Sequence, residues 1–310
     1  MHKFSAWFRI IRPPIIIISC LGALVGVLNV SAHINDGIIR ISFFQLFMVI
    51  IGATFLSAGL MIHNDVTDLK SDRINRPYKP LPSKKIKVKT AQTMGIILMI
   101  LSIVISLLVN INDTGLLNWR CGILTLSIFI VGITYNYYGK YHGIFGNILV
   151  AYGVGSIPYW GAVAVAPEPQ YLLVIMPLAF ALFIQEIGRE IMVNSGDYFG
   201  DLKAGFKTLP VLLGREKAMY IALIFYIVFI PIFPISYFGW LGSEKVFGNI
   251  YLIGGSIYAA ALISTWVLTY KVVIKRDEKK IWRAFELYER TGTRVMVIFF
   301  QIMLLFEAFL

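Results

Sequence analysis

Long apolar runs alternate along the chain with short polar segments, and each run is about as long as a membrane-spanning helix. Crossing the hydrocarbon core of a bilayer takes about 20 apolar residues in a helix. The runs lack the period-two alternation of a membrane β-barrel, and helices satisfy their own backbone hydrogen bonds in lipid. The pattern therefore predicts an all-α membrane protein with nine transmembrane helices, at about residues 13–31, 43–62, 92–110, 119–137, 145–165, 171–187, 218–239, 249–270 and 293–310.

Lysine and arginine fall almost entirely on one side of this predicted topology, the side that begins with the N-terminus. The exceptions are Arg40, Arg120, Lys245 and, at the start of the last span, Arg294. Because cytoplasmic loops are rich in Lys and Arg, we expect an integral protein of the cell membrane with its N-terminus in the cytoplasm and its C-terminus outside. The larger polar segments would form a cytoplasmic cap on one membrane domain of residues 1–310; they are about 63–91, 188–217 and 271–292.

Composition supports the membrane setting. The chain is 58% hydrophobic and 15% charged, with a mean hydropathy of +0.75, whereas soluble domains carry about 25% charged residues. The net charge of +11 mainly reflects the basic residues that set the topology. The same residues could also bind lipid headgroups or phosphates. The basic residues are scattered over five loops, so we expect the lipid bilayer and no nucleic acid as a partner. Within the last polar segment, residues 276–290 fit either an interfacial amphipathic helix or a solvated connector.

Two short acidic segments follow the second and sixth predicted spans, both on the predicted cytoplasmic side. The first contains Asp65, Asp68 and Asp72, and the second contains Asp197 and Asp201. Residues at these spacings share one face of a helix, where like charges repel unless a cation joins them. Carboxylates beside a membrane are costly, so their presence there suggests a function. Their oxygen atoms are hard ligands, which suit Mg²⁺. We predict that these five aspartates bind Mg²⁺, act in catalysis, and hold an anionic substrate such as a diphosphate.

Basic residues beside the two acidic segments could take the remaining phosphate charge. A solvated loop is the alternative interpretation for such charges. The candidates are Lys70, Arg73, Arg76, Lys79, Arg189, Lys203 and Lys207.

A divalent-cation transporter would also use carboxylates at a membrane edge. Transport sites, however, usually lie near the middle of the bilayer, and the predicted spans contain almost no ionisable residues. Both aspartate clusters fall at one mouth of the predicted bundle, which suits capture of a soluble headgroup that carries a membrane-bound tail.

Three segments carry a resemblance to a known family. Asn64-Asp65-x-x-Asp68-x-x-x-Asp72, followed by residues 73–83, resembles the first signature of the UbiA superfamily of intramembrane prenyltransferases. Residues 188–191, then Asp197-x-x-x-Asp201 and residues 205–210, resemble the second signature. Tyr135 and Lys140, with Gly146 and Asn147, resemble the middle segment of the family.

The resemblance implies a nine-helix bundle around a large central cavity, capped by the cytoplasmic loops. Such enzymes ionise an allylic prenyl diphosphate with the help of Mg²⁺ and pass the prenyl group to an acceptor. The five aspartates match metal-binding positions of the family, and Asn64 begins the same motif. Tyr135 and Lys140 would contact the diphosphate, with an aromatic-belt tyrosine and a topology-setting lysine as the alternative.

Three acceptors remain open within the family. The second segment most resembles the branch that adds a second geranylgeranyl chain to geranylgeranylglyceryl phosphate in lipid synthesis. An aromatic acceptor of quinone biosynthesis is the main alternative, ahead of a porphyrin-type acceptor. The chain departs from the family pattern at Lys79, where Arg is usual, and at Val193 and Gly196, where that branch often has basic and acidic residues.

Overall fold

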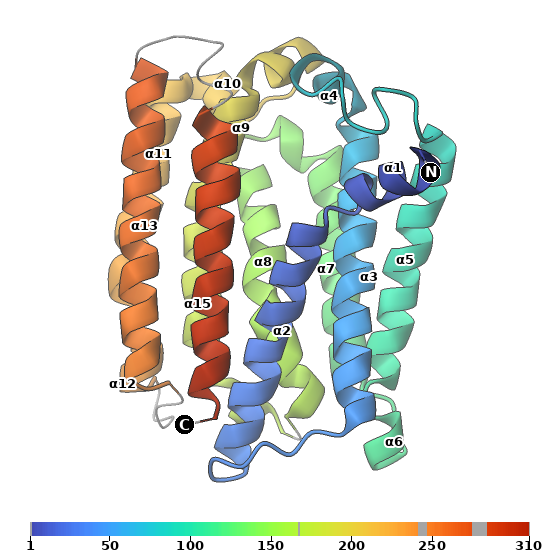
Figure 1. Ribbon diagram of the computed structural model, residues 1–310, viewed down its shortest axis with the longest axis vertical. Coiled ribbons are helices and arrows are strands. Elements are labelled where there is room, and N and C mark those ends of the chain that lie inside the picture. Colours follow the sequence, from blue (N-terminus) through green and yellow to red (C-terminus); the bar gives the residue numbers. More distant parts are fainter. Residues whose placement is uncertain (1, 167, 241–246, 275–283, 310) are drawn as a thin grey trace.

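The computed structural model describes residues 2–166, 168–240, 247–274 and 284–309, which form helices and no strand. In this part of the chain, seven helices are long and apolar enough to cross a membrane. They correspond to seven of the nine predicted spans and lie side by side in a bundle (Figure 1). They are α2 (Pro13–Ile34), α3 (Phe43–Thr67), α5 (Val88–Leu108), α7 (Trp119–Tyr137), α8 (Ile144–Val165), α11 (Arg215–Ile232) and α13 (Asn249–Ile274).

The two other predicted spans correspond to helices that are either too short or too polar to count as membrane-spanning by length and composition. α9 (Met176–Ala204) is long enough, but polar side chains interrupt its apolar run from Gln185 onward. α15 (Arg294–Glu307) has 14 residues, about 21 Å at 1.5 Å per residue, whereas the bilayer core is about 30 Å thick. α9 packs against α8 and α11, and α15 packs against α2 and α13. The prediction of nine spans is therefore confirmed for seven.

Glycines allow α2 and α8 to touch backbone to backbone. A Cβ atom on Gly26 of α2 would lie 1.8 Å from the carbonyl oxygen of Pro158 in α8. A Cβ atom on Gly161 of α8 would lie 2.0 Å from the carbonyl oxygen of Ala23 in α2. Small residues at such contacts let membrane helices approach closely and gain van der Waals contact. This pair forms one wall of the cavity described below.

Short helices cover the two ends of the bundle. α1 (His2–Ile10), α4 (Leu69–Asn75) and α10 (Leu209–Leu213) lie at the upper end in Figure 1, together with the end of α9. α6 (Ile111–Thr114) and α12 (Ile235–Phe238) lie at the lower end, and short 3₁₀ turns cover Gly139–Tyr141 (η1) and Pro169–Leu172 (η2). The N-terminus lies toward the upper end of the bundle and the C-terminus toward the lower end.

Two of the three predicted cap segments, 63–91 and 188–217, lie at the upper end and contain α4 and α10. The third, 271–292, lies partly outside the described residues, as does most of the amphipathic helix predicted at 276–290. Its described end is a π-helix, Glu286–Thr293 (η3), which leads into α15.

Candidate active site

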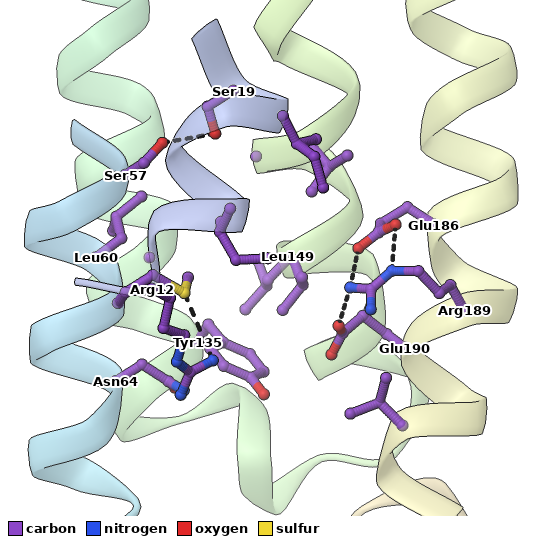
Figure 2. A pocket seen from close by; sticks show the side chains of 18 of the residues that line it. Arg12, Ser19, Ser57, Leu60, Asn64, Tyr135, Leu149, Glu186, Arg189 and Glu190 are labelled. Atoms are coloured by element: carbon purple, nitrogen blue, oxygen red, sulfur yellow. Dashed lines mark hydrogen bonds and ion pairs between the residues drawn. The ribbon is translucent and has the colours of Figure 1, made fainter. Parts of the chain in front are cut away.

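A cavity of about 330 Å³ lies inside the bundle. Its deeper walls are largely apolar and include Leu56 of α3, Ile128 of α7 and Leu182 of α9. Charged and amide side chains gather on the walls nearer to α4. Figure 2 shows part of this lining, with Tyr135 on one wall and Glu190 on the opposite wall. A largely apolar pocket with charged side chains at one end can hold a molecule with an apolar tail and an anionic head.

The first acidic motif lies where α3 ends and α4 begins. Asp68 and Asp72 both line the cavity. The carboxylate of Asp68 accepts hydrogen bonds from Lys140 Nζ and, at 2.9 Å, from Asn64 Nδ2. The carboxylate of Asp72 accepts a hydrogen bond from Lys79 Nζ at 2.6 Å. Each of these aspartates therefore has a lysine as its partner.

Asp65 does not line the cavity. Its side chain is buried and forms ion pairs with Arg12 and, at 3.0 Å, with Lys79. Arg12 lies between α1 and α2 with a left-handed backbone (φ 52°), and its guanidinium lines the cavity. Asp65 thus holds in place a cavity cation that the sequence did not indicate as part of the site.

The second acidic motif meets the first across the mouth of the cavity. Arg76 contacts both motifs, since its Nη1 lies 3.5 Å from Asp72 and its Nη2 lies 2.5 Å from Asp197. Ser71 of α4 donates a hydrogen bond of 2.9 Å to Asp201 of α9. Asp197 and Asp201 also line the cavity. The acidic segments of the two halves of the chain therefore converge at one end of the bundle.

The donor atoms at this mouth suit a hard divalent cation. Burial, together with the negative charge of Asp197, raises the pKa of Asp201 to about 8, and a cation bound there would favour its ionised form. Asn64 Oδ1 is buried and has no hydrogen-bond partner among the described residues. In the same part of the chain no three His, Cys, Asp or Glu side chains already form a metal cluster; Arg76, Lys79 and Lys140 hold the carboxylates instead. The oxygen ligands that could gather around Mg²⁺ are those of Asn64, Asp68, Asp72, Asp197 and Asp201.

The predicted phosphate-binding cations near the aspartates divide into three groups. Arg76 and Lys140 line the cavity, and Lys140 Nζ lies 5.2 Å from the centroid of the Tyr135 ring, which lines it too. Lys79 is not part of the lining, but it donates a hydrogen bond to Asp72, which is. The other candidates near the aspartates have exposed side chains outside the cavity lining, namely Lys70, Arg73, Lys203 and Lys207.

Arg189 lies deeper in the cavity than the aspartates and between two glutamates of its own helix. Its Nε donates to Glu186 at 2.7 Å, and its Nη2 contacts both Glu186 and Glu190. Gln185, on the same wall, is also part of the lining. The sequence analysis missed both glutamates and Gln185, although ionisable residues spaced i, i+3 and i+4 at the end of an apolar run were a usable signal.

Comparison with known proteins identifies the family. The sequence model of the UbiA prenyltransferase family matches residues 19–297. Digeranylgeranylglyceryl phosphate synthase of Methanocaldococcus jannaschii is 30% identical over 281 residues, which cover 91% of this chain and 91% of that protein. The protein of the same name from Saccharolobus solfataricus is 31% identical over 236 residues, which cover 76% of this chain and 78% of that protein.

Solved structures show the same fold. A structure from work on digeranylgeranylglyceryl phosphate synthase in membranes matches with a TM-score of 0.68 at 26% identity, covering 100% of this chain and 99% of that one. A UbiA homologue from Archaeoglobus fulgidus bound to GPP and Mg²⁺ matches with a TM-score of 0.64 at 19% identity, covering 97% and 99%. The chain therefore belongs to the UbiA prenyltransferase family.

Proposed function

We propose that the protein transfers a geranylgeranyl group from geranylgeranyl diphosphate to geranylgeranylglyceryl phosphate in membrane lipid synthesis. The observation that carries this proposal is the meeting of two aspartate motifs at the charged mouth of an apolar cavity. The names of the two archaeal relatives support the acceptor. The homologue bound to GPP and Mg²⁺ supports the class of donor and the ion.

The mouth of the cavity would bind the diphosphate of the donor. Mg²⁺ held by Asn64 and the four cavity aspartates would neutralise the diphosphate and make it a better leaving group. Arg12, Arg76 and Lys140 line the same mouth and would share the phosphate charge. Because Arg76 and Lys140 each bind a carboxylate in this structure, they would exchange that partner for phosphate oxygens.

The apolar depth of the cavity would hold the isoprenoid tail and exclude water. Ionisation of an allylic diphosphate leaves a carbocation, which water would quench, so a dry site favours transfer to the acceptor over hydrolysis. Tyr135 and Trp160 both line the cavity, and aromatic faces stabilise positive charge.

The proposed topology has nine spans, with α9 and α15 added to the seven. The polar side chains of α9 that lower its hydropathy line the cavity, so they would avoid lipid. The termini lie at opposite ends of the bundle, as an odd number of spans requires. The basic loops would place the N-terminus, the cap segments and the aspartate motifs in the cytoplasm, and the C-terminus outside.

A product assay tests the proposed function. The purified protein in detergent receives labelled geranylgeranyl diphosphate and Mg²⁺ with either geranylgeranylglyceryl phosphate or an aromatic quinone precursor. We expect a prenylated lipid in the first reaction, and its loss when a chelator removes Mg²⁺. Product from the aromatic acceptor alone would replace the proposed acceptor, and no product from either would overturn the proposed function.

A further inference from the structure

Three side chains of α9 that the proposed diphosphate site does not use surround Arg189 on the cavity wall. They are Gln185, Glu186 and Glu190, and each is at least 92% buried and lines the cavity. We propose that this wall binds the acceptor and that Glu190 is the general base that removes the proton from its attacking hydroxyl. This inference rests on the proposed function, because it concerns an alcohol acceptor at the same site.

The depth of Glu190 in the cavity suits this role. α9 runs toward the mouth, and Glu190 precedes Asp197 by seven residues, which is about 10 Å at 1.5 Å per residue. The carbon that is attacked is bonded to an oxygen of the diphosphate, so it lies on the cavity side of the aspartates. The attacking hydroxyl lies deeper again. Glu186 lies one further turn away from the mouth.

Glu190 shares its part of the cavity with an aromatic side chain of another helix. Figure 2 shows Tyr135 of α7 and Glu190 of α9 on facing walls of the cavity. Glu190 and Tyr135 therefore face the same part of the cavity.

A second observation points to a ligand at this wall. Gln185 is 2% exposed, and its Nε2 has no hydrogen-bond partner among the described residues. A buried amide donor without a partner is costly, and an oxygen atom of a bound acceptor would satisfy it. Arg189 contacts both glutamates, which fixes their positions on the cavity wall.

The reaction balances with these groups. The acceptor oxygen forms a bond to the allylic carbon, and the bond from that carbon to the diphosphate oxygen breaks, with its electron pair leaving on the pyrophosphate. The proton of the hydroxyl passes to the carboxylate of Glu190 and later to water. A positioned base typically contributes about 10²- to 10⁴-fold to the rate of such a step.

The test compares two variants of the same ion cluster. In Glu190→Gln we expect the rate constant for transfer to geranylgeranylglyceryl phosphate to fall by about 10²- to 10⁴-fold, while geranylgeranyl diphosphate with Mg²⁺ binds with an unchanged Kd. In Glu186→Gln, which removes the other carboxylate from Arg189, we expect a much smaller loss and the pH profile of the wild type. In Glu190→Ala we expect added formate to restore part of the transfer rate.

Two results would overturn the proposal: transfer by Glu190→Gln at the wild-type rate, or a parallel loss of transfer and of donor binding in that variant. Failure of the proposed function would give a different result, which can be seen without any variant, in the assay of the wild-type protein. There the donor binds with Mg²⁺, but no alcohol acceptor is prenylated.

Discussion

Asp197 joins the two halves of the site, because its carboxylate binds the Arg76 guanidinium that also approaches Asp72. In Asp197→Asn the side chain keeps its shape and loses its charge. We expect prenyl transfer to fall by about a hundredfold, as for the loss of one preorganised electrostatic contact in other enzymes. The measurement is transfer of label by the purified variant, with the exposed Lys89→Gln as the matched control. Wild-type activity in Asp197→Asn would place the second motif outside the site.

Asp65 is expected to matter more for stability than for chemistry. It lies off the cavity and pairs with Arg12 and Lys79, so Asp65→Asn takes a charged partner from two partly buried cations. Removing one member of a buried ion pair costs about 3–5 kcal/mol. We expect a clearly lower thermal unfolding midpoint in detergent, and weaker loss of donor binding than in Asp197→Asn. The reverse order of effects would mean that Asp65 is a ligand of the metal.

At the scale of whole helices, the contact between α2 and α8 depends on glycine. A Cβ atom in Gly26→Ala would fall 1.8 Å from the carbonyl oxygen of Pro158, so the two helices must separate. We expect this variant to unfold at a lower temperature, because overpacking typically costs about 1–3 kcal/mol. Gly153→Ala in α8 is the control, since a Cβ there meets nothing within 4 Å. Equal unfolding temperatures for the two variants would contradict this packing.

The sequence predicted the elements that depend on local pattern. Apolar runs located seven of the spans, and the helical spacing of the aspartates led to the prediction of two clusters at one mouth. Pairing between distant residues could not be predicted, because charge alone does not select a partner. Arg12, for example, precedes Asp65 by 53 residues. For the same reason, Lys203 and Lys207 are predicted to bind phosphate from their place beside the second motif, although of these two and Lys140 only Lys140 lines the cavity.

For the whole molecule, the proposed orientation places the two ends of the bundle in different compartments. The loop after α4 is rich in lysine, and Leu116, between α6 and α7, is 71% exposed at the other end. In a chain whose two native cysteines are replaced by alanine, we expect Leu116→Cys to react with an impermeant maleimide in intact cells. Lys85→Cys should react only after the membrane is opened. The opposite pattern would invert the topology.

At the cavity mouth Asp68, Asp72 and Asp197 each form an ion pair, with Lys140, Lys79 and Arg76 respectively. These charged side chains are already paired with one another before any donor arrives. Binding of the donor with Mg²⁺ would therefore replace these internal ion pairs with contacts to phosphate oxygens and to the metal ion. A diphosphate that came alone would face an excess of negative charge, and a divalent ion that came alone would compete with fixed ammonium and guanidinium groups. We therefore expect a low affinity for either one alone and a higher affinity for the two together.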